Sequence, residues 1–329
     1  MHSFRAFRIS SDGGRIHGEV VSATLDELSA GDVVIRAAYS SVNYKDALAA
    51  TGAGKILKKF PLIGGIDVSG TVMSSQDPHF HEGEEVLVTG YDLGVGNDGG
   101  FAGMVRVPGD WVVPLPAGLS LRDAMVFGTA GFTAGLGVVR LEQNGLRPGA
   151  GPVAVTGATG GVGSIAVGAL AKLGYEVTAI TGKDDAHDYL RALGAARVQP
   201  RGALELGTRP LEKAIWAGAV DAAGGDLLSW LVRTAAPWGA VASTGLTGGT
   251  NLTLTVMPFI LRGVSLIGVD SVTCPMDVRR DTWRRLATDM RPAALDRVAH
   301  DITLDELPSA FDTLLKGQAR GRFVVTLIA

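Results

Sequence analysis

Short runs of alternating hydrophobic and polar residues dominate the first third of the chain, and Gly, Asp and Pro separate them. An alternation with period two is typical of β-strands that bury one face. The strands predicted in this way span residues 4–9, 15–22, 32–39, 70–73, 85–89, 101–107 and 111–115. Their close spacing predicts a barrel-like, all-β unit over residues 1–123.

Beyond residue 121 the pattern changes to uninterrupted apolar runs that alternate with helix-length segments. The predicted strands are 153–156, 176–181, 197–199, 220–222, 240–244 and 264–269, and the predicted helices are 162–173, 184–193 and 226–236. Strands that alternate with helices predict a doubly wound parallel sheet, so the fold class is α/β. A last strand at 322–328 would pair most simply with the all-β unit. We therefore expect one discontinuous domain, 1–123 with 271–329, around a nucleotide-binding domain at 124–270.

Composition narrows the class of protein. The 329 residues are 46% hydrophobic and 19% charged, with a net charge of -3, which argues against binding to nucleic acid or to an anionic membrane. Two uncharged stretches, 148–171 and 234–261, contain glycines and are interpreted as buried strands joined by turns. The single cysteine, Cys274, excludes a disulfide within the chain and a cysteine-based zinc cage. We expect a cytoplasmic enzyme.

A glycine-rich turn is the strongest local motif. Residues 152–164 have the sequence P-V-A-V-T-G-A-T-G-G-V-G-S, which places a strand, a turn and a helix start in succession. Gly157 permits the sharp exit, Gly160 and Gly161 admit a pyrophosphate, and Gly163 lets the helix pack on the strand. The motif predicts a dinucleotide site, with a structural turn that binds no ligand as the alternative.

The end of the next strand indicates which dinucleotide binds. Thr181-Gly182-Lys183 stands there, with no acidic residue before Asp184. An acidic residue would hold the ribose of NAD, whereas small polar and basic groups suit the 2′-phosphate of NADP. The sequence predicts NADPH, and the alternative is a solvated lysine at a helix start.

Further motifs run nearly from end to end: S-S-V-N-Y-K-D (40–46), G-I-D-V-S-G-T-V (65–72), G-T-A-G-F-T-A (128–134), P-L-E-K (210–213), V-M-P-F-I-L-R-G-V (256–264) and G-V-D-S-V (268–272). With the glycine turn, they make the chain resemble the medium-chain dehydrogenase/reductase superfamily. It is most similar to the zinc-free acrylyl-CoA reductase branch, also known as YhdH/YhfP-type quinone oxidoreductases. The resemblance implies a Rossmann domain and a GroES-like catalytic domain.

The resemblance also bears on metal binding. Zinc-dependent members carry Gly-His-Glu where this chain has Gly65-Ile66-Asp67, and a cysteine where it has Thr129. His79 and His81 beside a predicted turn are interpreted as part of a solvated loop. We expect no metal site.

Several cofactor contacts are implied by the resemblance rather than by the residue pattern. Tyr44 and Thr133 would contact the nicotinamide. Thr159, Gly160, Gly161 and Val162 would hold the pyrophosphate, and Thr181, Gly182 and Lys183 the 2′-phosphate. Leu246, Ile260, Ser271 and Arg322 would close over the remainder. By hydrophobicity alone, Leu246 and Ile260 also fit core positions, and Cys274 fits an unreactive one.

The expected chemistry follows from the lack of zinc ligands. Without a Lewis acid, hydride transfer to a conjugated enoyl thioester is easier than hydride transfer from an alcohol. Hydrogen bonds suffice to stabilise the enolate that forms. Tyr44 is the candidate proton or hydrogen-bond donor, although it also suits simple packing, and Asn43 and Asp46 are candidate positioning residues. Lys55, Lys58 and Lys59 would meet coenzyme A phosphates or lie in solvent.

Three functions therefore compete. The first is NADPH-dependent reduction of acrylyl-CoA or a similar short enoyl-CoA, an oxidoreductase reaction on a CH–CH group. The second is NADPH:quinone reduction, and the third is a non-enzymatic NADPH-binding or RNA-binding protein. A homodimer is expected, because strand 264–269 is placed last in the sheet and leaves an apolar edge.

Overall fold

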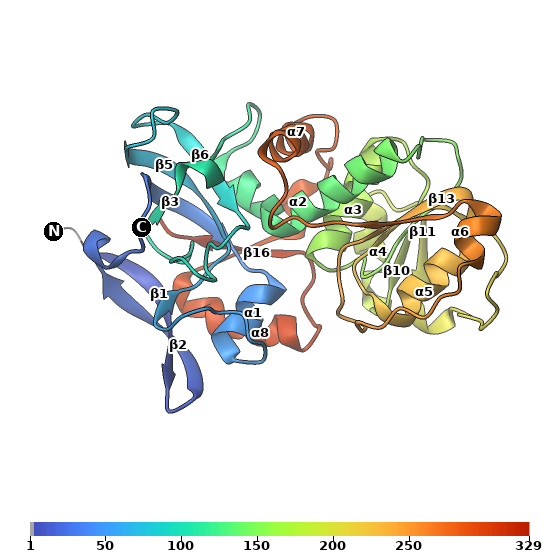
Figure 1. Ribbon diagram of the computed structural model, residues 1–329, viewed down its shortest axis with the longest axis horizontal. Coiled ribbons are helices and arrows are strands. Elements are labelled where there is room, and N and C mark those ends of the chain that lie inside the picture. Colours follow the sequence, from blue (N-terminus) through green and yellow to red (C-terminus); the bar gives the residue numbers. More distant parts are fainter. Residues whose placement is uncertain (1–2, 329) are drawn as a thin grey trace. The chain divides into compact units, whose positions relative to one another are not determined.

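The chain forms two compact units, which are described separately below (Figure 1). The structure is a computed structural model that describes residues 3–328. The β unit comprises Met1–Thr129 and Ala299–Ala329, and the α/β unit comprises Ala130–Val298. Both boundaries differ from the domain limits expected from the sequence. In particular, residues 271–298 fold with the α/β unit rather than with the β unit.

The described part of the β unit contains an antiparallel sheet, a mixed sheet in which only β15 and β16 run parallel, and the covering helices α1 and α8. The smaller sheet has the order β2-β1-β4, and the larger has the order β15-β16-β3-β5-β6-β8, with β7 beside β3. Strand β16 pairs antiparallel with β3, so the end of the chain completes the sheet that the front began. The strands are β1 (Phe4–Asp12), β2 (Arg15–Ala23), β3 (Val33–Ser41), β4 (Leu62–Ile63), β5 (Asp67–Ser75), β6 (Glu85–Thr89), β7 (Met104–Val107), β8 (Val113–Pro114), β15 (Ala299–Ile302) and β16 (Arg322–Thr326), and the helices are α1 (Tyr44–Thr51) and α8 (Leu307–Leu315).

An aromatic cluster fills the core between these helices and the smaller sheet. The rings of Phe7 and Phe311 lie 5.7 Å apart edge to face, and Phe7 and Phe101 lie 6.4 Å apart. Edge-to-face pairs of buried rings add to the stabilisation from burial. The same buried cluster includes three alanines of α1, Ala47, Ala49 and Ala50. This packing therefore fixes the helix that begins at Tyr44.

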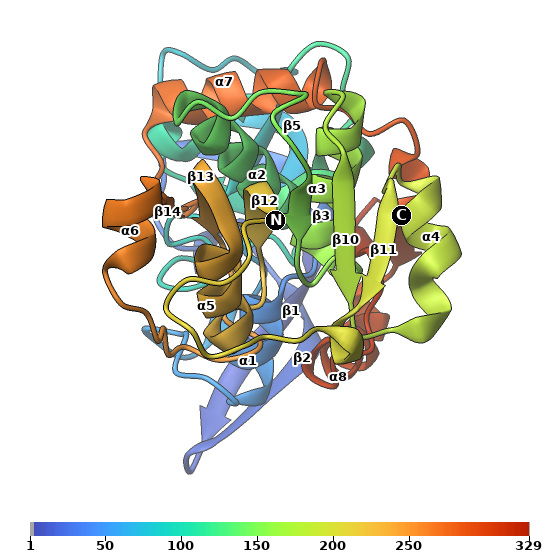
Figure 2. The ribbon, with the colours of Figure 1, turned by 90° about the vertical axis from the view of Figure 1, so that its right-hand side faces the viewer.

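The α/β unit is built on a six-stranded parallel sheet in the order β11-β10-β9-β12-β13-β14 (Figure 2). The chain moves outward in one direction from β9 and in the other from β12. Right-handed crossovers then place α3 and α4 on one face and α5 and α6 on the other, with the switch point between β9 and β12. The elements are β9 (Val153–Val155), α3 (Gly161–Lys172), β10 (Val177–Thr181), α4 (His187–Ala192), β11 (Arg197–Pro200), β12 (Trp216–Asp221), α5 (Gly225–Thr234), β13 (Ala235–Ser243), α6 (Met257–Arg262) and β14 (Ser265–Gly268).

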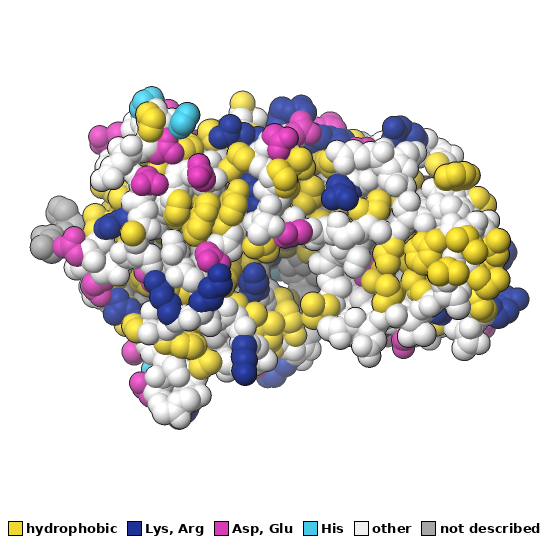
Figure 3. Space-filling view, viewed as in Figure 1, with side chains coloured by type: hydrophobic (Ala, Val, Ile, Leu, Met, Phe, Trp, Pro, Cys, Tyr) yellow, Lys and Arg dark blue, Asp and Glu magenta, His cyan; other side chains and the backbone are white. Residues whose placement is uncertain are grey.

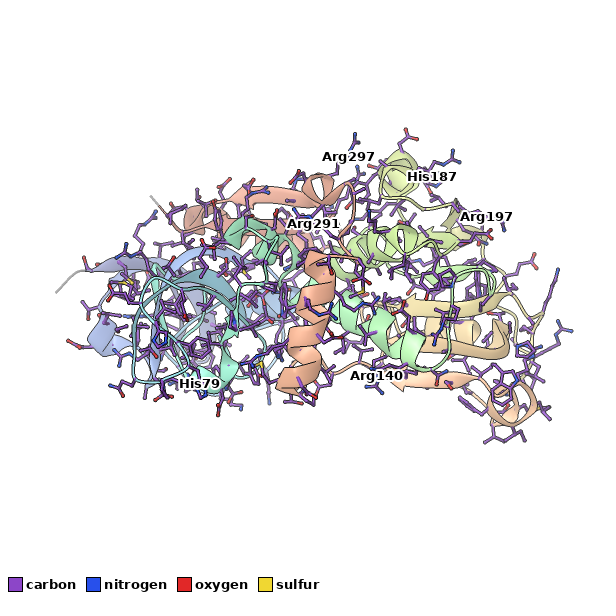
Figure 4. All side chains as sticks on the ribbon, turned by 90° about the horizontal axis from the view of Figure 1, so that it is seen from above. His79, Arg140, His187, Arg197, Arg291 and Arg297 are labelled. Atoms are coloured by element: carbon purple, nitrogen blue, oxygen red, sulfur yellow. The ribbon has the colours of Figure 1, made fainter. Side chains whose placement is uncertain are left out.

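Two further helices explain why the boundary near residue 271 was misplaced. The α/β unit holds most of α2 (Leu121–Gln143) and all of α7 (Met276–Ala287), and α7 lies across α2 in Figures 1 and 4. Phe132 and Trp283 stack across this contact with ring centroids 5.9 Å apart. Because the contact is made by α7, the segment after β14 stays with the α/β unit. Helix α2 is long and apolar enough to cross a membrane, but 89% of its most apolar window is buried in the protein.

Candidate functional site

The glycine-rich turn leaves backbone amides uncovered at the start of α3. Gly160 caps this helix without a side-chain hydrogen bond. A Cβ on Gly163 would lie 2.3 Å from the Gly157 oxygen, so the close packing there requires glycine, whereas a Cβ on Gly160 would meet only that oxygen, at 3.4 Å. The space at Gly160 is therefore open, and uncovered amides at a helix N-terminus bind anions. These residues fit the pyrophosphate of a dinucleotide.

Asp221, which sequence reasoning did not single out, connects the ends of β9 and β12 at the switch point of the sheet. Its carboxylate accepts a hydrogen bond from the Thr156 hydroxyl at 2.5 Å and another from the Gly224 amide at 2.8 Å. Burial raises the pKa of this carboxyl group. The only sequence signal was an acidic residue at the end of a buried strand. The contact joins Thr156, which directly follows β9 and precedes Gly157, to the last residue of β12.

The end of β10 forms a basic corner. The Thr181 hydroxyl oxygen accepts a hydrogen bond from the Lys183 amide at 3.0 Å, which leaves the hydroxyl proton free to be donated. A Cβ placed on Gly182 would lie 3.4 Å from an Nη atom of Arg201. Arg201 was missed because it follows β11 in a segment without periodic pattern. Thr181, Lys183 and Arg201 together suit a phosphate monoester.

Two of the remaining predicted contacts in this unit, Leu246 and Ser271, also follow carboxyl ends of strands, and Thr133 and Ile260 lie on helices α2 and α6. The loop after β14 carries Ser271, whose hydroxyl oxygen accepts a hydrogen bond from the Thr133 hydroxyl at 2.8 Å. Leu246 follows β13 and is 58% exposed, and Ile260 on α6 is 71% exposed. The alternative interpretation of Leu246 and Ile260 as core residues is therefore wrong. All these residues except Thr133 and Ile260 gather at one edge of the sheet, where dinucleotides bind in this class of fold.

In the β unit, a polar cluster surrounds Asp67. One carboxylate oxygen of Asp67 accepts hydrogen bonds from the Ser41 hydroxyl (2.6 Å), the Asn43 amide group (2.7 Å) and the Thr129 backbone amide (2.9 Å). The other oxygen accepts one from the Thr129 hydroxyl at 2.5 Å. We call these residues, with Arg322, the Asp67 cluster. The resemblance places Gly-His-Glu of zinc-dependent members at residues 65–67 and a cysteine at residue 129, and here Asp67 and Thr129 bond to each other.

Arg322 completes the Asp67 cluster. Its Nη2 atom lies 3.5 Å from an Asp67 oxygen and donates to the Ser41 hydroxyl at 2.7 Å, and its Nη1 atom donates to the Asn43 side-chain oxygen at 3.0 Å. Arg322 is 3% exposed, and burial lowers the pKa of its guanidinium. A Cβ on Gly128 would lie 2.3 Å from the Ser41 hydroxyl, so only glycine, at φ 51°, fits beside the Asp67 cluster.

Asn43 and Asp46 lie next to this cluster and set the start of α1. The Asp46 carboxylate accepts hydrogen bonds from the backbone amides of Asn43 at 2.8 Å and Ile66 at 3.0 Å. Burial, together with the charge of Asp67, raises the pKa of Asp46 to about 7. Tyr44, the first residue of α1, is 38% exposed. The structure thus brings Asn43, Asp46 and Arg322 together and leaves the Tyr44 ring accessible beside them.

The lysine cluster is only partly available to a ligand. Lys58 makes a bidentate ion pair with Asp92, with both Nζ–oxygen distances at 2.8 Å. Lys59 donates to the Ser29 hydroxyl at 3.2 Å, and Lys55 is exposed. Lys58 is therefore largely neutralised, which leaves Lys55 and Lys59 as the stronger candidates for phosphate contacts.

The histidines near residue 80 do not form a ligand set with other residues. His79 pairs with Asp77 at 2.7 Å and lies at the outer edge of its unit in Figure 4. Among residues 3–328, no group of three or more His, Cys, Asp or Glu side chains is arranged to hold a metal ion.

Known proteins resemble this chain over its whole length. Residues 29–117 match the model of the alcohol dehydrogenase GroES-like domain, and residues 161–289 match that of the zinc-binding dehydrogenase family. The chain is 50% identical to the putative quinone oxidoreductase YhfP of Bacillus subtilis, over 98% of this chain and 99% of that protein. It is also 50% identical to the probable acrylyl-CoA reductase AcuI of Escherichia coli, over 92% and 94% of the two chains.

Solved structures of such relatives share the fold. The YhdH oxidoreductase of Salmonella enterica in complex with NADP superposes with a TM-score of 0.96 at 48% identity, over 98% of this chain and 100% of that one. YhfP of Bacillus subtilis with NAD bound gives 0.97 at 49% identity, over 99% and 100% of the two chains. These likenesses confirm the predicted fold class. The chain belongs to the medium-chain dehydrogenase/reductase superfamily, in the family of acrylyl-CoA reductases and YhdH/YhfP-type quinone oxidoreductases.

Proposed function

We propose that this protein is an NADPH-dependent enoyl-CoA reductase that converts acrylyl-CoA or a similar short enoyl-CoA to the acyl-CoA without a metal ion. The observation that carries the proposal is the Asp67 cluster. Asp67 accepts hydrogen bonds from Thr129 and lies 3.5 Å from the Arg322 cation, so the side chains present do not suit a Lewis acid. A substrate activated by its own conjugation needs none. The relative named as a probable acrylyl-CoA reductase supports the same substrate class.

The reaction divides into a hydride and a proton step. When bound, NADPH supplies the hydride that adds to Cβ of the enoyl thioester. The negative charge then lies on the thioester oxygen, and a proton must reach Cα. We assign that donation, or a hydrogen bond to the oxygen, to the Tyr44 hydroxyl. Asn43 and Asp46 fix the backbone from which Tyr44 projects.

The cofactor preference rests on the basic corner. The Thr181 hydroxyl and the Lys183 and Arg201 cations suit a 2′-phosphate, and no carboxylate stands at the end of β10 to select a ribose hydroxyl. A relative has been crystallised with NADP and another with NAD, and the ratio of kcat/KM with NADPH to that with NADH measures the preference of this chain.

We further propose a cytoplasmic homodimer that pairs through β14. This strand is last in its sheet, and the large hydrophobic side chains near it are exposed: Trp238 at 83%, Ile260 at 71% and Leu261 at 60%. Figure 3 shows apolar side chains gathered over α6. An exposed apolar edge of this kind is typical of subunit contacts.

NADPH:quinone reduction is the second candidate, because a 50% identical relative is named a putative quinone oxidoreductase. A screen of NADPH oxidation with acrylyl-CoA, crotonyl-CoA, longer enoyl-CoAs and quinones decides between them by kcat/KM. The enoyl-CoA assignment requires the highest value with a short enoyl-CoA and no loss of turnover after prolonged EDTA treatment. If NADPH binds but none of the acceptors gives turnover, the result would favour a non-enzymatic binding protein.

The variant Tyr44→Phe tests the assigned proton donor. It should lower kcat on acrylyl-CoA by about 10–1000-fold while NADPH affinity stays nearly constant, because one donor is lost and the ring remains. Quinone reduction forms no thioester enolate and serves as the internal control. A kcat within about threefold of the wild type would remove Tyr44 from the chemistry, since ring packing alone is retained.

A further inference from the structure

Arg279 on α7 is a fully buried cation that lies against a loop of the candidate cofactor site. Its side chain is 0% exposed. One guanidinium nitrogen, Nη2, donates hydrogen bonds to the backbone carbonyls of Ser271 at 3.0 Å and Val272 at 3.1 Å. A buried charge is costly unless it is hydrogen-bonded. The loop after β14 is therefore attached to α7 through this side chain.

The same guanidinium also contacts helix α2. Its central carbon lies 4.7 Å from the ring centroid of Phe132, which itself stacks on Trp283. Phe132 directly precedes Thr133, the residue whose hydroxyl bonds to Ser271. Arg279 thus touches both segments that supply the Thr133–Ser271 pair.

The loop is also restrained by Asp270, which bonds to its amide groups and not to the carbonyl groups that Arg279 contacts. The Asp270 carboxylate accepts hydrogen bonds from the amides of Val272 at 2.8 Å and Thr273 at 3.2 Å. Asp270 holds amide groups of the loop, and Arg279 holds two of its carbonyl groups. The loop follows the carboxyl end of β14, at the edge of the sheet where the glycine turn lies.

We propose that Arg279 is a positioning residue for the cofactor: by bridging the Ser271 and Val272 carbonyls and the Phe132 ring, it holds the Ser271 hydroxyl against Thr133 in the conformation that receives NADPH. The inference rests on the proposed function, since Ser271 and Thr133 matter only if they contact that cofactor. Lysine cannot replace the arginine fully, because the planar guanidinium stacks on the Phe132 ring while its Nη2 atom donates to both carbonyls, and a compact ammonium has no plane to stack.

Arg279→Lys tests the proposal, with Thr282→Val as the matched control. Thr282 is equally buried on α7 but bonds only to the Val278 carbonyl of its own helix, at 2.8 Å. Arg279→Lys should raise the Kd for NADPH about tenfold, which corresponds to one lost hydrogen bond to a charged group. The KM for acrylyl-CoA at saturating NADPH should change less than about twofold, and Thr282→Val should change neither constant by more than that.

Cys274 provides a readout that needs no cofactor. It is the only cysteine in the sequence, it is 5% exposed at the end of the same loop, and burial raises the pKa of its thiol. If Arg279 holds the loop, Arg279→Lys should speed the reaction of this thiol with a disulfide reagent at least about threefold, since access limits a buried thiol. Thr282→Val should leave the rate unchanged.

A double-mutant cycle locates the effect. If Arg279 acts through Thr133 and Ser271, the pair Arg279→Lys and Thr133→Val should raise the NADPH Kd by clearly less than the product of the single effects. The proposal is overturned if Arg279→Lys leaves the Kd within twofold of the wild type, if Thr282→Val raises it equally, or if the effects multiply fully. Failure of the proposed function would instead show in the wild type, as no NADPH oxidation with any enoyl-CoA.

Discussion

The Asp67 cluster of the β unit and the carboxyl edge of the parallel sheet both hold predicted site residues, but they are constructed in opposite ways. In the Asp67 cluster, charged side chains are buried and bond to one another, with Asp67 at 0% and Arg322 at 3% exposure. At the sheet edge, glycines leave backbone amides open, and Gly182 and Leu246 are exposed. One region satisfies its polar groups internally, and the other keeps them for a ligand.

The contrast shows where substitutions should act. A buried charge that loses its partner costs free energy of folding, whereas an open anion site costs little to change until the ligand binds. Variants of the Asp67 cluster should therefore change stability, and variants of the sheet edge should change cofactor affinity.

Arg322→Gln should have the largest effect. It leaves the Asp67 carboxylate buried without its cation and should lower the free energy of unfolding by about 3–5 kcal/mol, measured by urea denaturation. The double variant Asp67→Asn/Arg322→Gln should recover part of that loss. Unchanged stability combined with weak NADPH binding would instead make Arg322 a cofactor contact, as the family resemblance implies.

Lys183→Ala tests the opposite region. It should weaken NADPH binding by about 1.5–3 kcal/mol, the usual contribution of a charged hydrogen bond, and leave NADH binding and stability unchanged. Arg201→Ala should act in the same direction, and Lys172→Ala, at the far end of α3, is the matched control. Equal losses for NADPH and NADH would contradict a 2′-phosphate contact.

Gly160→Ala sharpens the distinction within one turn. Gly160 has φ −79° and ψ 177°, which alanine adopts readily, so stability should change by less than about 0.5 kcal/mol. The added methyl group should raise the NADPH Kd about tenfold, because it occupies the approach of the pyrophosphate. Gly163→Ala should instead lower the stability of the folded protein, because its Cβ would lie 2.3 Å from the Gly157 carbonyl oxygen. Identical behaviour of the two variants would contradict this assignment.

The smallest change per experimental step, about 1 kcal/mol for each pH unit, should come from protonation of Asp46. Its pKa is raised to about 7, so the folded state binds this proton more tightly than the unfolded chain does. The stabilisation that the protonated Asp46 carboxyl group gives the folded state is fully present below the unfolded pKa of about 4. It is lost as pH rises through 7. The stability of the wild type relative to Asp46→Asn should fall by about 1 kcal/mol per pH unit between pH 5 and 7 and level off above 8. A flat difference in urea denaturation across this range would contradict the raised pKa.

Local patterns predicted the sheet edge better than the Asp67 cluster. The glycine turn and Thr181 lie within 30 residues, and their spacing alone indicates a strand, a turn and a helix. The Asp67 cluster joins residues from positions 41 to 322, and no periodicity in the sequence relates them. Arg279 was missed for the same reason, since it reaches its partners through tertiary contacts, whereas Arg201 was missed because it follows β11 in a segment without periodic pattern. Helix α7 was missed because charged residues interrupt its apolar face, and the domain limit was misplaced with it.

The two outer strands of the parallel sheet carry opposite chemistry. Strand β11 ends in Pro200, which has no amide to donate, and its Arg197 forms an exposed ion pair with Glu176 at 3.0 Å. Strand β14, with the sequence S-L-I-G, contains neither a proline nor a charged side chain. If copies of the chain associate by extending this sheet, growth is possible from one side alone, so assembly would stop at a closed pair and could not continue into a fibre.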